Sequence, residues 1–79
     1  MKELIKVLQV LQTKCNAWKC DYERAIYQMG IDEMWNIVSG EEVSINDVFN
    51  SVKNIKPYLE PEDTTIFWAA MSKAKLTRQ

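Results

Sequence analysis

The sequence predicts an all-α protein, and three observations support this fold class. Apolar residues recur every three or four positions through most of the first thirty residues, which is the periodicity of one face of an α-helix. Apolar residues make up 47 % of the chain and charged residues 27 %, which is a globular composition. Two glycines and two prolines leave no room for a linker or a low-complexity tract. We therefore expect residues 1–79 to form a single small helical domain.

The first segment has the most regular pattern in the chain. Its apolar residues form a seam with alternating spacings of four and three, and no proline or glycine interrupts it. Gly30 follows the seam and suits the C-terminal cap of a helix, where glycine adopts a positive φ at little cost. The pattern predicts one long helix over residues 3–29, with a seam of Leu4, Leu8, Leu11, Cys15, Trp18, Tyr22, Ala25 and Met29.

The length of this predicted helix bears on function. Residues 3–29 would form a rod of about 40 Å at 1.5 Å per residue. A compact chain of this size has a radius of gyration of about 12 Å and a diameter of about 30 Å. The helix must therefore kink, project beyond the domain, or bury its surplus against another chain. The last option is the strongest indication of a binding function in the sequence.

Three shorter helices are predicted to pack along the first one. The first of them runs from Asp32, a candidate N-cap, to Gly40. Residues 35–45 also fit a small β-hairpin with a Ser-Gly turn, which would make the fold α+β instead. We favour the helix and keep the hairpin as the alternative.

The other two helices have clearer boundaries. Ser44 and Asp47 have the spacing of a capping box, and the residue before Pro57 avoids helical angles. A helix is therefore expected between them, with an apolar stripe of Ile45, Val48, Phe49, Val52 and Ile55. The last helix is expected to begin near Pro61, because proline is favoured in a first helical turn.

The stretch CNAWKC, residues 15–20, contains the only two cysteines. On a helix their side chains would point about 140° apart. Their Cα atoms would then lie beyond the limit of about 7 Å for a disulfide. The spacing is not that of a zinc site, and the chain has no histidine. Cys15 lies on the seam and is expected in the core, whereas Cys20 is expected to be a free surface thiol.

Catalysis is not expected. The absence of histidine removes the commonest general base near neutral pH. The chain has no glycine-rich phosphate loop and no nucleophile elbow. Adjacent carboxylates such as those of Glu41 and Glu42 are explained as solvated groups in loops or helix caps. We therefore expect no enzyme activity, no cofactor and no metal site.

The distribution of charge bears on partners and location. Residues 31–63 contain eight acidic and two basic groups, a local charge of −6. Residues 32–54 have the outline of a helix-turn-helix, but this charge would repel phosphate and disfavours nucleic acid. No apolar run approaches the roughly 18 residues of a membrane span. Lys6 and Gln9 interrupt what would be a signal-peptide core. We therefore expect a cytoplasmic protein.

Protein binding is the function that these exclusions leave. A second stripe, the rear stripe, lies behind the seam of the first helix and consists of Val10, Thr13, Ala17, Cys20, Arg24 and Tyr27. It is short of charge, which is typical of an interface. It is equally consistent with a second buried face, and both interpretations stay open. Trp68 and Met71 in the last helix could anchor a partner or close the core, and the core role is the more common one. The candidate binding residues are Val10, Ala17, Cys20, Arg24, Tyr27, Trp68 and Met71.

The hypothesis is thus a non-catalytic helical protein that acts by binding another protein. It would be an adaptor, a subunit or a small inhibitor of the kind that bacteria and their phages encode. Self-association into a homodimer through the first helix is a special case. The alternative, from another class, is a small DNA-binding regulator that uses the helix-turn-helix outline.

Overall fold

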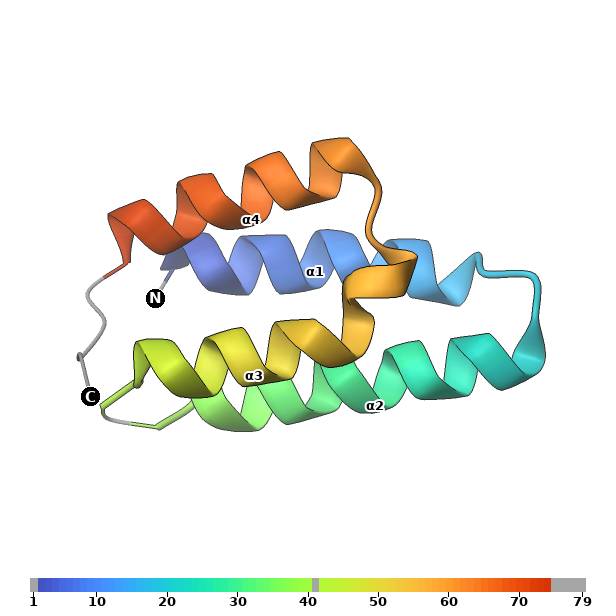
Figure 1. Cartoon of the computed structure of the whole chain (residues 1–79), viewed down its shortest axis with the longest axis horizontal. Coiled ribbons are helices and arrows are strands. Elements are labelled where there is room, and N and C mark those ends of the chain that lie inside the picture. Colours follow the sequence, from blue (N-terminus) through green and yellow to red (C-terminus); the bar gives the residue numbers. More distant parts are fainter. Residues whose placement is uncertain (1, 41, 75–79) are drawn as a thin grey trace.

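The computed structural model describes residues 2–40 and 42–74, and within them the chain forms four α-helices (Figure 1). These are α1 (Lys2–Asn16), α2 (Asp21–Val38), α3 (Ile45–Ile55) and α4 (Pro61–Lys73), with a short 3-10 helix η1 (Lys56–Tyr58). The prediction of an all-α bundle is confirmed. The alternative hairpin at 35–45 is not supported, because α2 continues to Val38 and α3 begins at Ile45.

The prediction of one long helix over residues 3–29 is wrong, because the helix is interrupted near the middle of that range. α1 ends at Asn16 and α2 begins at Asp21. The backbone N–H of Trp18 donates to the carbonyl of Cys15 at 3.0 Å, which is the tighter three-residue spacing common at helix ends. The acidic residues Asp21 and Glu23 lie in the first turn of α2, where the helix dipole favours negative charge.

Because the helix is interrupted, residues 3–29 fit within a compact domain without a second chain to cover them. The molecule has a radius of gyration of 11.9 Å and extends 35 × 21 × 17 Å along its principal axes. α1 and α2 run side by side in opposite directions, so residues 3–29 do not form one rod, and only the joined ends of α1 and α2 extend beyond α3 and α4 (Figure 1). An overhanging first helix therefore no longer supports a binding function, and any binding surface must be argued from other residues.

Gly30 does not end a helix as predicted but lies buried inside α2. Asp32 likewise lies within α2 and does not cap a separate helix. A Cβ atom built on Gly30 would lie only 2.2 Å from Cγ2 of Ile55 in α3. Its φ is not positive, so the close approach of α2 and α3 explains the glycine, and an unusual backbone conformation does not.

We expect Gly30→Ala to destabilise the protein by up to about 2 kcal/mol. Overpacking costs about 1–3 kcal/mol, and the higher helix propensity of alanine offsets about 1 kcal/mol of it. Urea unfolding followed by circular dichroism measures the effect. In an Ile55→Ala background the clashing methyl is gone, so the same substitution should become neutral or stabilising. Stabilisation in the wild-type background would contradict the close approach.

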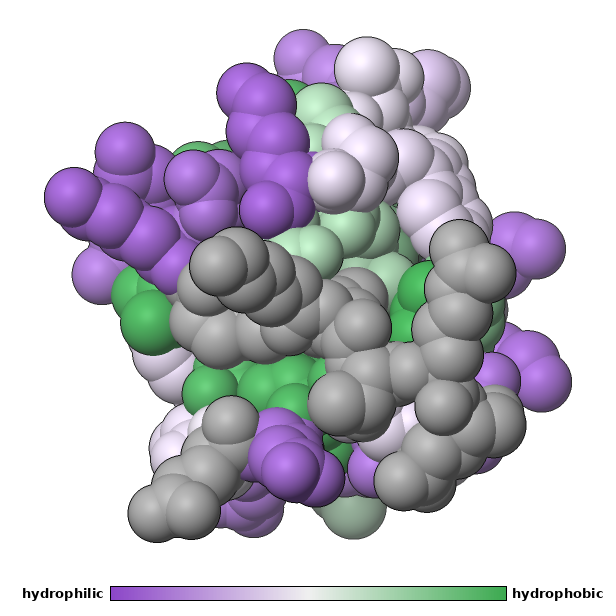
Figure 2. All heavy atoms as spheres, turned by 90° about the vertical axis from the view of Figure 1, so that its left-hand side faces the viewer, coloured by the Kyte–Doolittle hydropathy of each residue, from purple (hydrophilic) through white to green (hydrophobic). Residues whose placement is uncertain are grey.

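The helices pack in the order α4–α1–α2–α3, and α3 and α4 do not pack along each other (Figure 1). The core therefore lies along α1, which α4 covers on one side and α2 on the other. Figure 2 views the end at which α1 begins, where hydrophobic residues show in the middle and hydrophilic ones at the edge. The buried apolar residues are Leu4, Val7, Leu8, Leu11, Cys15, Tyr27, Ile31, Met34, Val38, Val43, Val48, Ile55, Phe67, Ala70 and Met71. Among the described helices, none is long and apolar enough to cross a bilayer.

Candidate functional site

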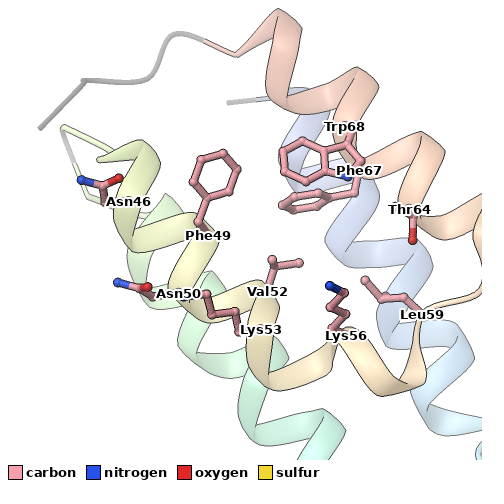
Figure 3. A pocket seen from close by; sticks show the side chains of 10 residues that line it. All are labelled: Asn46, Phe49, Asn50, Val52, Lys53, Lys56, Leu59, Thr64, Phe67 and Trp68. Atoms are coloured by element: carbon pink, nitrogen blue, oxygen red, sulfur yellow. The ribbon is translucent and has the colours of Figure 1, made fainter.

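The open side between α3 and α4 contains a groove of about 610 Å³ (Figure 3). α3 and η1 form one wall, α4 forms the other, and Leu59 lies in the connection between them. The lining residues are Asn46, Phe49, Asn50, Val52, Lys53, Lys56, Leu59, Thr64, Phe67 and Trp68. Apolar side chains dominate the floor and polar side chains the rim, which is the usual composition of a binding groove.

Three aromatic side chains meet at the α4 wall of this groove. The rings of Phe49 and Trp68 lie 5.3 Å apart between centroids and join the two walls. The rings of Phe67 and Trp68 are 5.5 Å apart in an edge-to-face arrangement. Phe67 is buried, whereas Trp68 is 47 % exposed. A large aromatic side chain held in place by two others and still half exposed is typical of an interface anchor.

The sequence of α3 explains why the groove exists. Val48, Ser51 and Ile55 are buried on the side that packs against α2. Phe49 and Val52, with Ile45, point about 90° further round the helix and are only partly buried. The apolar face of α3 is therefore wider than one neighbouring helix covers. Because α4 packs on α1 instead, the second half of this face lines the groove.

The groove carries positive charge within an otherwise acidic part of the chain. Lys53 and Lys56 are the only two basic residues between positions 31 and 63, and both line it. None of the seven acidic residues of the same range that the structure describes does so. Within residues 2–40 and 42–74, neither lysine forms an ion pair. In Figure 3 the side chain of Lys56 extends from η1 into the groove.

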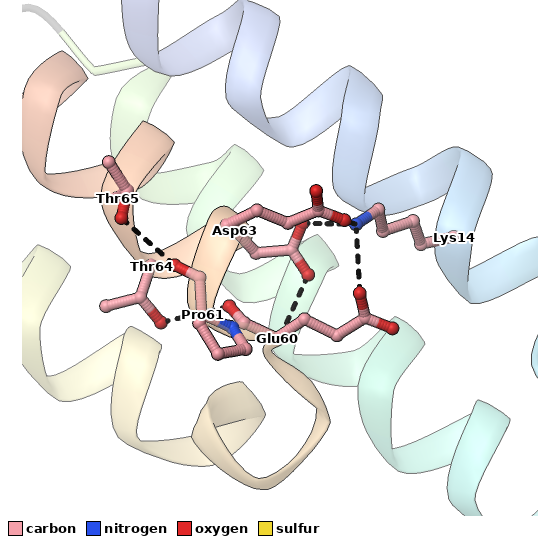
Figure 4. A network of polar contacts seen from close by, with 7 residues as sticks. Lys14, Glu60, Pro61, Asp63, Thr64 and Thr65 are labelled. Atoms are coloured by element: carbon pink, nitrogen blue, oxygen red, sulfur yellow. Dashed lines mark hydrogen bonds and ion pairs between the residues drawn. The ribbon is translucent and has the colours of Figure 1, made fainter.

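The acidic residues at the start of α4, next to Thr64 of the groove, are engaged by Lys14 of α1 (Figure 4). The Lys14 ammonium lies 2.5 Å from the carboxylate of Asp63, 3.0 Å from Glu62 and 3.8 Å from Glu60. The hydrogen bonds to Asp63 and then Glu62 raise the pKa of Lys14. Asp63 also accepts a hydrogen bond from the backbone N–H of Glu60 at 3.0 Å, the reach-back bond of a capping box. Lys14 thus ties the start of α4 to α1.

The break at residues 17–20 is held by an aromatic cluster at the opposite end from the α1 N-terminus. Tyr27 and Tyr58 stack with ring centroids 5.3 Å apart. Trp18 meets both rings edge-on, at 5.7 Å from Tyr27 and 5.4 Å from Tyr58. Arg24 donates to the carbonyl of Trp18 at 3.3 Å and pairs with Asp21. These contacts explain why the chain turns here although its helical periodicity continues.

The structure does not bring the predicted binding residues of the first helix together. Val10 is 41 % exposed on α1, and Ala17 and Cys20 are exposed in the connection to α2. Arg24 is partly buried and bound to Trp18 and Asp21. Tyr27 is fully buried in the core. The rear stripe is therefore divided between two helices and does not form one continuous surface.

Met71 and Trp68, the two candidate residues in the last helix, also lie in different environments. Met71 is buried in the core, whereas Trp68 lies at the wall of the groove. Of the predicted residues, Trp68 alone lines the groove. Val10 lies instead beside Ile66 in a shallower depression of about 400 Å³ between α1 and α4. Sequence reasoning missed the residues of α3 and η1, although the width of the α3 stripe was a usable signal for Phe49 and Val52.

The two cysteines have different environments and no bond between them. Cys15 is buried, and burial raises the pKa of its thiol, which disfavours the reactive thiolate. Cys20 is exposed at the N-cap position of α2, where its side chain makes no capping hydrogen bond. Across residues 2–40 and 42–74, no cluster of three potential metal ligands is present. CNAWKC is thus a turn between helices, and Cys15 packs in the core as expected.

The helix-turn-helix outline takes a different shape in the structure. That motif joins its two helices at roughly 90–120°. Here α2 and α3 lie along each other in opposite directions (Figure 1). Ser51, one of the residues that would contact bases, is fully buried. Asn46, Asn50 and Lys53 line the groove instead. The arrangement of α2 and α3 therefore does not favour DNA recognition.

Comparison with known proteins adds no relative to this description. No protein-family model, curated protein or solved structure matches the chain. The candidate site is accordingly argued from its own geometry.

Proposed function

We propose that this protein is a non-catalytic binding module and that the groove between α3 and α4 is the surface that holds its protein partner. One observation carries the proposal: α3 and α4 present apolar walls to each other and meet at the Phe49 and Trp68 rings, but they do not pack along their length. Burial of such walls is the main favourable term in most protein association. An adaptor, a subunit or a small inhibitor would all act through such a surface.

The chemistry of the groove supports binding rather than catalysis. Among its ten lining residues, only Lys53 and Lys56 have charged side chains, and both are exposed. A general base or nucleophile would need a pKa shifted by burial or by a close partner. The floor instead offers aromatic and aliphatic surface, and Trp68 has the exposure and support of an anchor residue.

Peptide display tests this proposal without knowledge of the natural partner. An unbiased library of 15-residue peptides is selected on the full chain, and the affinities of the enriched peptides are measured by fluorescence anisotropy. We expect Trp68→Ala to weaken them by roughly 10- to 30-fold, the effect of removing an anchor. The matched control is Ile66→Ala, because Ile66 is 43 % exposed on the same helix outside the groove.

The control variant separates the two apolar surfaces of the molecule. Both variants are first compared with the wild-type protein by circular dichroism, so that loss of binding is not confused with loss of fold. If Ile66→Ala weakens the peptides and Trp68→Ala does not, the depression between α1 and α4 is the binding surface. A selection that enriches no peptide would contradict the protein-binding function itself.

A further inference from the structure

We infer that the occupant of the groove is an acidic amphipathic α-helix of a partner protein, with its carboxylates placed on Lys53 and Lys56. This inference rests on the proposed binding function and adds the chemistry of the partner. It draws on the position of the two lysines, the polar groups around the groove and the geometry of its walls.

The charge pattern selects an acidic partner. Eight acidic residues surround Lys53 and Lys56 in the sequence, yet both lysines line the groove and none of the seven described acidic residues does. Lys14 already engages the carboxylates at the start of α4. Among the described residues the groove is therefore a positively charged site within an acidic region. Charge complementarity fixes the register of a partner more than it raises affinity.

The remaining rim groups suit a helical peptide with polar flanks. Asn46, Asn50 and Lys53 follow one another at spacings of four and three along the exposed edge of α3. Amide side chains donate and accept hydrogen bonds, so they tolerate several polar neighbours. Thr64 stands on the opposite wall. The charged and neutral polar groups thus border an apolar floor along its length, which matches an amphipathic segment rather than a wholly apolar one.

The shape of the groove favours a helix over an extended segment. The α3 and η1 wall runs from Asn46 to Lys56, about 15 Å or three helical turns. Phe49 and Val52 from one wall and Phe67 and Trp68 from the other form the apolar floor, and a further helix of a bundle would lie over it (Figure 3). The described helices offer no sheet edge to which a strand could add. A partner helix would present apolar residues at i, i+3, i+4 and i+7 to this floor.

A small apolar carboxylate is the competing occupant, because the cavity volume is within the usual range for small ligands. Such sites enclose most of their ligand, about 70–90 % of its surface. Trp68, in contrast, is 47 % exposed at the wall of this groove. Open walls of this kind suit a long occupant that is buried on one face only, which is how an amphipathic helix binds.

The test is a second selection with a charge-reversed protein. A library of amphipathic 15-residue peptides, with fixed apolar positions and random polar ones, is selected on the wild-type chain and on Lys53→Glu/Lys56→Glu. We expect acidic residues to be enriched on the wild type and basic residues on the variant. The control is Lys6→Glu/Lys19→Glu, which has the same net charge but changes exposed lysines outside the groove, and should keep the wild-type preference.

Affinities then give the size of the effect. For the best wild-type peptide, we expect the groove charge reversal to weaken binding about tenfold or more, and the control reversal to change it by less than about threefold. Replacing the acidic residues of that peptide by lysine should restore binding to the groove variant. The peptide should also gain helical circular dichroism signal when it binds.

The possible outcomes distinguish failure of the acidic-helix inference from failure of the proposed binding function. Peptides lost with Trp68→Ala but without acidic preference would overturn the acidic partner and leave the binding groove in place. Proline-rich peptides with no gain of helicity would overturn the helical partner in the same way. If no peptide depends on Trp68, both the inference and the proposed function fail. If decanoate shifts tryptophan fluorescence and displaces every peptide at equal affinity across the charge variants, the groove is a small-molecule site.

Discussion

Tyr27→Glu is expected to unfold the protein rather than to weaken a surface contact. The Tyr27 ring is fully buried, and Trp18 and Tyr58 pack against it. Loss of a buried aromatic ring costs about 3–5 kcal/mol, and burial of a carboxylate adds several more. A domain of this length has a total stability near the low end of the range of about 5–15 kcal/mol. Circular dichroism at 25 °C should therefore show loss of most helical signal.

The matched control is Tyr27→Phe, which keeps the ring and removes the hydroxyl. The Tyr27 hydroxyl is buried without a hydrogen-bond partner in the described structure. A buried polar group in that state costs about 1–3 kcal/mol, so the phenylalanine variant should be as stable as the wild type or more stable by about 1 kcal/mol. A folded Tyr27→Glu protein would show instead that this position is at the surface, as the rear-stripe interpretation requires.

The stability of the wild-type protein should depend on pH in a way that the stability of Tyr27→Phe does not. Burial, and after it the charge of Asp63, raises the pKa of Tyr27 from its ordinary value of 10.0 to about 12. The folded state therefore holds the phenol proton more tightly than the unfolded state. The resulting stability is fully present below pH 10 and is lost as the pH rises from 10 to 12, by roughly 2–3 kcal/mol. The urea midpoint should fall less between pH 9 and pH 12 for Tyr27→Phe than for the wild-type protein, because phenylalanine cannot ionise.

The break between α1 and α2 shows where periodicity fails as a guide. In residues 20–30 the chain carries apolar residues on two faces. One continues the seam with Tyr22 and Met29, which are 76 % and 71 % exposed. The other begins at Tyr27 and continues to Ile31, and this face is buried. The spacing of apolar residues is helical on both faces, so it does not show which face is buried. Tertiary packing decides this, because the turn at residues 17–20 lets α1 and α2 bury their apolar faces against each other.

Later elements were more predictable because their boundaries depend on backbone chemistry. α3 follows Ser44 and α4 begins at Pro61, as the sequence predicts. The cap of α3 lacks a side-chain hydrogen bond at Ser44, however, and the capping contact between Glu60 and Asp63 was not foreseen. Of the groove residues, only Trp68 was predicted from the sequence as a binding residue. The other wall of the groove depends on which face of α3 meets α2, and that choice follows from the close approach at Gly30.

Asp63→Ala is expected to cost roughly 2–3 kcal/mol, the second large effect. Asp63 is 2 % exposed, binds the Lys14 ammonium, and accepts the backbone N–H of Glu60. Its removal breaks a charge-assisted contact between α1 and α4 and leaves a helix-terminal N–H without its acceptor. Urea unfolding at pH 7 measures the loss. Because α4 forms one wall of the groove, binding of selected peptides should weaken as the folded fraction falls.

Two further variants separate the charge of Asp63 from its cap. Asp63→Asn keeps an oxygen that accepts the Glu60 N–H but loses the charge that holds Lys14, so it should cost less than Asp63→Ala. Glu62→Gln removes the charge of an exposed carboxylate 3.0 Å from the same ammonium and should change stability little. The ranking follows from burial, since Asp63 alone among these partners is withdrawn from water. Equal losses from Asp63→Asn and Glu62→Gln would show that burial of the Lys14–Asp63 pair does not matter, and that Asp63 stabilises the protein mainly through its capping bond to Glu60.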